Sequence, residues 1–212
     1  MIKLVAFDID DTLTRGTSIW EMIYRLLGTW ESVGAKHLER FRLGEIDYNE
    51  FARADAYEFR GTPSRIVAEA ASRLSYAPEM EETFAKLHEK GVTTALVSCS
   101  IKQFADWLGE KLGVQHVFAN PLIVGPDGML TGEIELALPV SEKRQTMLDL
   151  REALGFSKKE ILAVGDSVLD FTMFEEAGKS CCVSHAPQEV KSAVTHCLPG
   201  DSLLGVLDLL ES

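Results

Sequence analysis

The chain has 212 residues, of which 46% are hydrophobic and 25% are charged, an ordinary composition for a globular protein that buries a sizeable core. Its 33 acidic and 21 basic residues give a formal net charge of −12, which repels nucleic acid and anionic lipid, so we expect neither as a partner. No apolar run has the length of a membrane span and no signal-peptide pattern is present, so the expected location is the cytoplasm, without membrane contact. The four cysteines form no CxxC pair and are expected to be reduced and buried.

A short apolar segment at residues 2–7 is expected to form a strand that is buried on both faces. It ends in three acids within four positions, Asp8, Asp10 and Asp11. Two like charges about 4 Å apart repel by about 4 kcal/mol at an effective dielectric constant of about 20. The three carboxylates are therefore either spread into water, as in a simple acidic turn, or gathered around a cation.

Residues 15–77 show helical patterns and no strand pattern, so we expect a helical insertion directly after the first strand. Capping residues and terminal glycines predict four helices in it. The expected helices are Ser18 to Leu27, Trp30 to Leu43, Asp47 to Phe59, and Thr62–Pro63 to Leu74.

From Pro78 onward, helical and strand patterns alternate, which predicts a parallel sheet with helices on both faces. The expected strands are residues 92–98, 116–119, 161–164, 180–184 and 195–198, with a hairpin at 122–124 and 129–135. The expected helices are residues 78–90, 101–112, 141–154, 169–177, a short one from Pro187, and a last one capped by Asp201. The predicted fold is thus α/β, a Rossmann-like parallel sheet sandwiched by helices (residues 1–14 and 78–212) with an inserted helical cap domain (residues 15–77).

Polar side chains gather at or near the carboxyl ends of the predicted strands, where ligands bind in such sheets. Taken singly, each has an ordinary explanation: a serine can cap a helix, a lysine can be solvated, and an aspartate can shape a turn. Together they supply carboxylates, a hydroxyl and an ammonium group, and oxygen ligands of this kind suit Mg²⁺. The residues are Asp8, Asp10, Ser98, Lys143, Asp166 and Asp170.

The order and spacing of these residues resemble those of phosphatases of the haloacid dehalogenase (HAD) superfamily, and within it the phosphoserine phosphatase branch. The helical insertion after the first motif is similar to the small helical cap of that branch, and the sheet corresponds to the HAD core. The matching motifs are Asp8-Ile9-Asp10-Asp11-Thr12, Ser98, Lys143 and Gly165-Asp166…Asp170.

The resemblance implies a mechanism through an aspartyl-phosphate. Asp8 would attack phosphorus, and Asp10 would protonate the leaving alcohol and then activate the hydrolytic water. Mg²⁺ would be held by Asp8, the backbone carbonyl of Asp10 and Asp166, with Asp170 in support.

The same resemblance implies the groups that bind the substrate. Ser98 and Lys143 would bind the phosphoryl oxygens, and Cys99 would lie beside the phosphate pocket. The cap offers Arg53, although Asp55 lies nearer to the position of the family's arginine, and no acid precedes Glu21 where the family has a glutamate. The expected substrate is a small phosphorylated metabolite, with phosphoserine as one candidate among others.

Other functions that fit these residues are a phosphomutase, a dehalogenase and a receiver-type module that only accepts a phosphoryl group. Asp10 argues against the last two, because neither a halide leaving group nor a retained phosphate needs an acid–base residue. A mutase differs only in the acceptor of the phosphoryl group. The chain is expected to act as a monomer or a homodimer.

Overall fold

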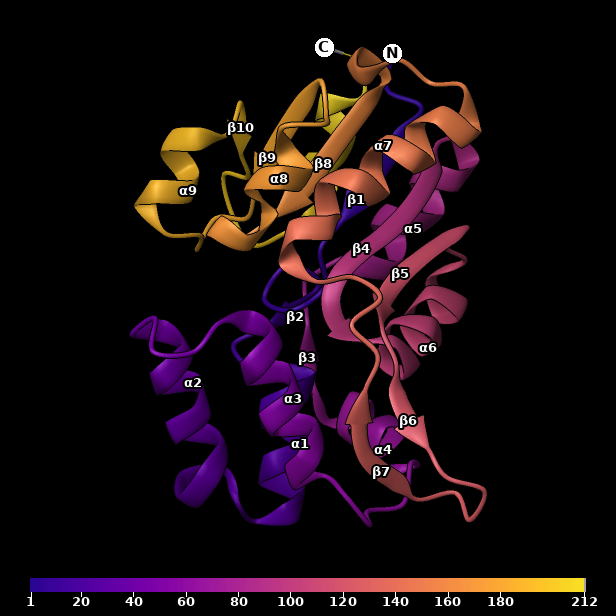
Figure 1. The fold of residues 1–212 in the computed structure, drawn as a ribbon. Coiled ribbons are helices and arrows are strands. Elements are labelled where there is room, and N and C mark those ends of the chain that lie inside the picture. The colour runs from indigo at the N-terminus through magenta and orange to yellow at the C-terminus, as the bar shows by residue number, and fades with distance from the viewer. Residues whose placement is uncertain (212) are drawn as a thin grey trace.

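The structure, a computed structural model, describes residues 1–211 and is built on a parallel six-stranded sheet of order β10-β9-β8-β1-β4-β5 (Figure 1). All neighbouring strands in it run parallel. The strands are β1 (Leu4–Phe7), β4 (Thr93–Ile101), β5 (His116–Asn120), β8 (Ile161–Gly165), β9 (Lys179–Cys182) and β10 (His196–Cys197).

The first strand lies in the middle of the sheet, between β4 and β8, and all four of its residues are buried. Its last residue, Phe7, is in register with Leu96 of β4 and Val164 of β8. The residues that follow β1 therefore emerge beside the carboxyl end of β8 and the last part of β4, at the edge where ligands bind in sheets of this kind.

Helices cover both faces of the sheet, with α5 and α6 on one side and α7 and α8 on the other (Figure 1). Phe7 of β1 packs against Phe84 of α5 with ring centroids 4.8 Å apart, so the apolar strand and helix share one core. The predicted α/β class is confirmed. The helices are α5 (Met80–Glu89), α6 (Lys102–Leu112), α7 (Lys143–Leu154), α8 (Phe171–Phe174), α9 (Gln188–Ala193) and a final 3-10 helix (Leu203–Leu209).

The insertion after β1 is helical, as predicted. The expectation that residues 15–77 contain no strand is wrong at its two ends, where β2 (Thr14–Arg15) and β3 (Ser75–Tyr76) form a short antiparallel ribbon that joins the insertion to the sheet. Within residues 1–211 no helix has the length and apolar character needed to cross a bilayer. The helices of the insertion are α1 (Ile19–Leu27), a π-helical turn (Trp30–Gly34), α2 (Ala35–Arg42), α3 (Tyr48–Glu58) and α4 (Ile66–Arg73).

The predicted capping residues account for two helix starts in this insertion. The Ser18 hydroxyl accepts a hydrogen bond from the Glu21 amide at 3.2 Å, and Asp47 and Glu50 form a reciprocal capping box at the start of α3. Such caps satisfy amides that have no partner inside the helix. Local sequence thus determines these boundaries.

The fourth helix starts later than predicted, at Ile66 rather than at Thr62–Pro63. The segment before it pairs with a hairpin of β6 (Leu122–Val124) and β7 (Leu130–Ile134), which extends from the sheet along the helical insertion (Figure 1). The Leu130 amide donates to the Thr62 carbonyl at 2.8 Å, and the Ser64 amide donates to the Gly128 carbonyl at 2.9 Å. These long-range bonds displace the helical start that the local sequence favours.

Three further local predictions need correction. The strand predicted to end at Ser98 continues to Ile101, so Ser98 lies inside β4 rather than at its end. The final helix is capped by Ser202 rather than Asp201, since the Ser202 hydroxyl accepts the Leu204 amide at 3.2 Å. Cys197 is exposed rather than buried, although all four cysteines are free, as expected.

Candidate active site

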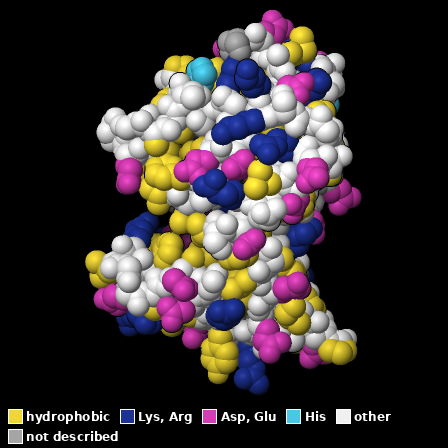
Figure 2. All heavy atoms as spheres, turned by 45° about the horizontal axis from the view of Figure 1, so that its top comes forward, with side chains coloured by type: hydrophobic (Ala, Val, Ile, Leu, Met, Phe, Trp, Pro, Cys, Tyr) yellow, Lys and Arg dark blue, Asp and Glu magenta, His cyan; other side chains and the backbone are white. Residues whose placement is uncertain are grey.

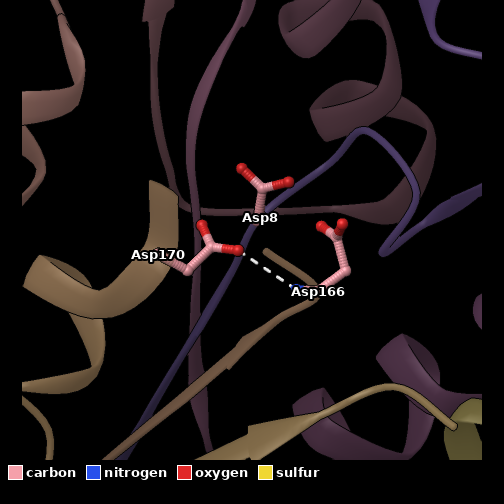
Figure 3. A group of neighbouring side chains, drawn as sticks. All are labelled: Asp8, Asp166 and Asp170. Carbon is pink, nitrogen blue, oxygen red and sulfur yellow. Dashed lines mark hydrogen bonds between the residues drawn. The ribbon is translucent and has the colours of Figure 1, made fainter. Parts of the chain in front are cut away.

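Three carboxylates converge at the carboxyl ends of β1 and β8 (Figure 3). Asp8 directly follows β1 and Asp166 directly follows β8, while Asp170 ends the 3-10 turn after Asp166. One oxygen atom from each lies within 4.8 Å of the others. The sheet register brings these acids together although more than 150 residues separate the first from the others in sequence.

Lys143, the first residue of α7, lies between two of these acids and is 1% exposed. Its Nζ atom is 2.7 Å from Asp8 Oδ1 and 2.7 Å from Asp170 Oδ1. Burial alone would lower the pKa of Lys143, but the two carboxylates hold it well above its usual range. The lysine is therefore a fixed positive charge at the bottom of the site.

One ammonium group does not neutralise the acids around it. Burial raises the pKa of Asp8 to about 7 against the opposing effect of Lys143, and burial together with the neighbouring Asp170 raises the pKa of Asp166 well above its usual range. Buried, mutually repelling carboxylate oxygens are the donor set that a hard divalent cation prefers. The residues present therefore fit Mg²⁺.

Hydrogen bonds fix the orientation of the two later acids. The Thr12 hydroxyl donates to Asp166 Oδ1 at 3.0 Å, and Asp170 Oδ2 accepts the amides of Asp166 and Ser167, each at 3.1 Å. One carboxylate oxygen of Asp170 accepts these amides and the other accepts Lys143 Nζ, so Asp170 mainly holds the loop and the lysine in position.

Asp10 lies in the same cavity, but its side chain is not part of the three-carboxylate group. Its Oδ1 atom accepts the amide of Ile19, the first residue of α1, at 3.0 Å. Burial raises the pKa of Asp10. The nearby Ser100 hydroxyl opposes this rise in the pKa of Asp10. The buried Ser100 Oγ atom itself makes no hydrogen bond to any of the described residues.

The segment of β4 that carries Ser98 forms another wall of the cavity. Ser98 is buried, and its Oγ atom accepts the Ser100 amide at 3.2 Å. The backbone carbonyl of Cys99 accepts hydrogen bonds from Asn120 Nδ2, at 3.1 Å, and from the Tyr48 hydroxyl. Tyr48 starts α3, so this last bond joins the helical insertion to the sheet.

Asp11 has a different role from the two acids before it. Its backbone is left-handed with φ of 61°, and its side chain accepts the Gly16 amide at 3.0 Å. Its own amide donates to the Thr14 hydroxyl at 2.9 Å. Asp11 therefore shapes the turn that leads into the insertion.

The site opens into a cavity of about 350 Å³ between the sheet and the helical insertion. On the face shown in Figure 2, hydrophobic side chains gather at a hollow between the two parts of the molecule. The cavity contacts Asp8, Asp10, Ser98, Cys99, Lys143 and Asp166. Arg53 is exposed and does not reach it, whereas Arg42 does, so the structure does not bring the predicted cap arginine to the site.

Four residues that contact this site had no individual role in the sequence analysis, although Thr12 stands in the first motif: Thr12, Tyr48, Ser100 and Asn120. Ser100 could have been found, because side chains two apart on a strand share a face and Ser98 was already a candidate. Tyr48 and Asn120 gave no such signal, since they reach the site only through contacts with a distant segment.

A parallel α/β sheet with these acids at its strand ends and a helical insertion after the first strand defines a class of hydrolase. The sequence matches the haloacid dehalogenase-like hydrolase family over residues 5–175, and the chain belongs to this family. The resemblance expected from the sequence is therefore confirmed.

The similar proteins within this family include several that are named phosphoserine phosphatases. The chain is 29% identical over 210 residues to a phosphoserine phosphatase of Archaeoglobus fulgidus, covering 99% of this chain but 60% of that protein. It is 32% identical over 177 residues to a phosphoserine phosphatase of Methanocaldococcus jannaschii, covering 83% and 82% of the two chains.

Solved structures agree with this placement. A HAD family hydrolase of Salmonella enterica serovar Typhi superposes with a TM-score of 0.91 at 25% identity, over 99% of this chain and 71% of the other. A phospho-aspartyl intermediate analogue of phosphoserine phosphatase superposes with a TM-score of 0.86 at 28% identity, over 99% of each chain.

Proposed function

We propose that the protein is a Mg²⁺-dependent hydrolase of phosphate monoesters that works through a phosphorylated Asp8. The observation that carries this proposal is the contact of Lys143 Nζ with both Asp8 and Asp170, each at 2.7 Å, in a cavity that Asp10 and Asp166 also line. Membership of the hydrolase family and the relatives named phosphoserine phosphatase support it.

Asp8 is the nucleophile in this proposal. An Asp8 carboxylate oxygen forms a bond to phosphorus while the bond from phosphorus to the alcohol oxygen breaks. Two anions meet only if their repulsion is cancelled, and Lys143 supplies a buried positive charge within hydrogen-bond distance of Asp8. Ser98, at the wall of the same cavity, offers its hydroxyl to the phosphoryl oxygens.

Asp10 moves the protons. Its raised pKa favours the protonated carboxyl that can donate to the leaving alcohol oxygen. The resulting carboxylate then takes a proton from the water that attacks the phosphorylated Asp8, which releases phosphate and restores both acids. The Ile19 amide holds this side chain in place through both steps.

Asp8 and Asp166 would hold the metal ion, with Asp170 in support and the Asp10 backbone carbonyl as the further ligand implied by the family resemblance. When bound, Mg²⁺ supplies charge stabilisation to the phosphoryl oxygens. The three-carboxylate group and its excess negative charge support this assignment.

We further propose that residues 1–14 and 78–212 form the catalytic core domain and residues 15–77 the cap domain over the cavity. The substrate is a small phosphorylated metabolite, and phosphoserine, the substrate in the names of the relatives, is one candidate among others. A cytoplasmic location and a monomeric or homodimeric state remain our expectations.

Phosphate release from a panel of small phosphomonoesters, measured with Mg²⁺ and with EDTA, tests the function. We expect release that depends on Mg²⁺, and an acid-quenched phosphoenzyme that is absent from Asp8→Asn. A phosphoenzyme that persists without phosphate release would instead support a receiver-type module, and transfer to a second substrate hydroxyl without release would support a mutase.

A further inference from the structure

The half of the cavity that faces the helical insertion is mostly apolar. Whereas the sheet end presents acids and Lys143, the insertion contributes aromatic and aliphatic side chains from α1, the π-helical turn, α2 and α3. These residues are Trp20, Trp30, Leu38, Phe41, Tyr48 and Phe51. A phosphoryl group held at Asp8 would direct the rest of its ester toward this wall.

Three of these rings form a packed cluster. Phe41 of α2 stacks on Phe51 of α3 with centroids 5.2 Å apart and an interplanar angle of 17°. Tyr48 meets Phe41 and Phe51 edge-on, with centroids at 6.2 and 6.4 Å. Phe41 and Tyr48 are only half-buried, so the cluster is held by its own contacts and still presents ring surface to the cavity.

The carboxylates of this half are already paired within the chain. Glu21 binds Arg25 at 2.6 Å, and Asp55 accepts the Tyr24 hydroxyl at 2.8 Å and contacts His37 Nδ1 at 2.8 Å. A substrate ammonium group would have to compete with these partners, and a substrate carboxylate would meet negative charge here.

Arg42 is the remaining charged group of this wall, and it has no ion pair among the described residues. Its side chain is exposed at the end of α2, where water screens its charge. An exposed charge of this kind contributes little to the binding of an anion. The apolar surface, rather than Arg42, therefore dominates recognition on this side.

Building on the proposed phosphatase activity, we propose that the preferred substrates are phosphate monoesters of an uncharged aromatic or apolar alcohol, and that Phe41, Tyr48 and Phe51 bind this alcohol. The reaction is the same hydrolysis at Asp8. What the aromatic cluster adds is selection of the leaving group, so an amino-acid phosphate is a poorer substrate than an apolar ester of similar reactivity.

A series of primary alkyl phosphates tests this preference, because their leaving alcohols differ in polarity far more than in acidity. We would measure kcat/KM for ethyl phosphate, O-phosphoserine and 2-phenylethyl phosphate with Mg²⁺. The expected result is a value for 2-phenylethyl phosphate about tenfold or more above those of the other two. If O-phosphoserine has the highest kcat/KM, this inference is wrong but the phosphatase activity stands. If no ester is turned over, both the phosphatase activity and this inference are wrong.

Variants of the cluster locate the preference. In Phe41→Ala we expect the ratio of kcat/KM for 2-phenylethyl phosphate to that for ethyl phosphate to fall to nearly 1. Phe41→Leu keeps an apolar side chain and should lower this ratio less. Tyr57→Ala is the matched control, because Tyr57 is also an aromatic residue of the insertion but is 60% exposed and outside the cavity. An unchanged ratio in a folded Phe41→Leu or Phe41→Ala would contradict the assignment, as would an equal loss in Tyr57→Ala.

Discussion

The Tyr48 hydroxyl, at the start of α3, donates a hydrogen bond to the backbone carbonyl of Cys99 in β4. Burial raises the pKa of Tyr48 well above its usual range, so the hydroxyl remains a donor at every working pH. The bond ties the helical insertion to the strand segment that carries Ser98. The bond thus links the helical insertion to the sheet at the cavity itself.

Tyr48→Phe should weaken this link without disrupting the fold. The Cys99 carbonyl keeps Asn120 as a donor at 3.1 Å, so we expect a loss of about 1 kcal/mol in the free energy of unfolding. Turnover should fall several-fold, because Ser98 loses part of its support. Urea unfolding and kcat/KM measure the two effects. Tyr57→Phe removes an exposed hydroxyl from the same helix and should change neither quantity. If both variants behave alike, the hydrogen bond from Tyr48 to Cys99 contributes to neither stability nor turnover.

Asp8→Asn should remove turnover and leave the fold intact. An amide has no negative charge and cannot form the phosphoenzyme, so we expect kcat to fall by about 10³-fold or more. Asp11→Asn is the matched control in the same loop, since an asparagine oxygen can still accept the Gly16 amide, and activity should stay within a few-fold of wild type. Circular dichroism confirms folding. Near-normal activity in Asp8→Asn would contradict the mechanism.

Lys143→Met should cost stability as well as activity, because it leaves Asp8 and Asp170 buried without their shared cation. Removing one partner from a buried ion pair costs about 3–5 kcal/mol, which urea unfolding at neutral pH would detect. Lys102→Met removes a partly exposed lysine that pairs with Asp106 on α6, and should cost less than about 1 kcal/mol. Equal losses in the two variants would show that burial of Lys143 has no energetic consequence.

Mg²⁺ should raise the melting temperature, because a ligand that binds only the folded protein stabilises it. We expect the shift to disappear with EDTA and in Asp166→Asn, which removes one ligand of the three-carboxylate group. Asp149→Asn, which changes an exposed acid of α7 outside the group, should retain it. If the melting temperature of Asp166→Asn still rises with Mg²⁺, the ion binds somewhere other than the three-carboxylate group.

The features of this protein that were predictable from sequence depend on local rules or on sheet topology. The short apolar segment before Asp8 favours a buried strand, and parallel strands place their carboxyl ends at one edge. Those two facts brought Asp8, Asp166 and Asp170 together in the prediction before any contact was known. The N-cap at Ser18 and the capping box at Asp47 likewise depend on a few neighbouring residues.

The features that were missed depend on contacts between distant segments. The helix predicted to start at Thr62–Pro63 starts at Ile66, because the residues before it pair with the β6–β7 hairpin, and no local signal in the sequence reveals that pairing. The choice between Arg42 and Arg53 depends on how α2 and α3 turn toward the cavity, and helical periodicity alone does not fix the direction of a face. The Tyr48 contact spans 51 positions in sequence.

We expect Asp55 to make the stability of the helical insertion depend on pH. The side chain is buried between Tyr24 and His37, and burial raises its pKa from 3.8 to about 6 even though both partners oppose the shift. Glu58 adds a small repulsion. Between these two pKa values the folded protein binds more protons than the unfolded chain, so the free energy of unfolding falls as pH rises from about 4 to about 6.

Asp55→Asn removes this titration while keeping an acceptor for the Tyr24 hydroxyl. A rise in pKa from 3.8 to about 6 corresponds to about 3 kcal/mol, so the stability of the wild type relative to Asp55→Asn should decline by up to that amount across this window and stay level above it. Urea unfolding of both proteins from pH 4 to pH 8 gives the difference. Asp47→Asn, at the exposed cap of the same helix, controls for the loss of a carboxylate elsewhere in the insertion. Parallel stability curves for wild type and Asp55→Asn would show that folding does not raise the pKa of Asp55.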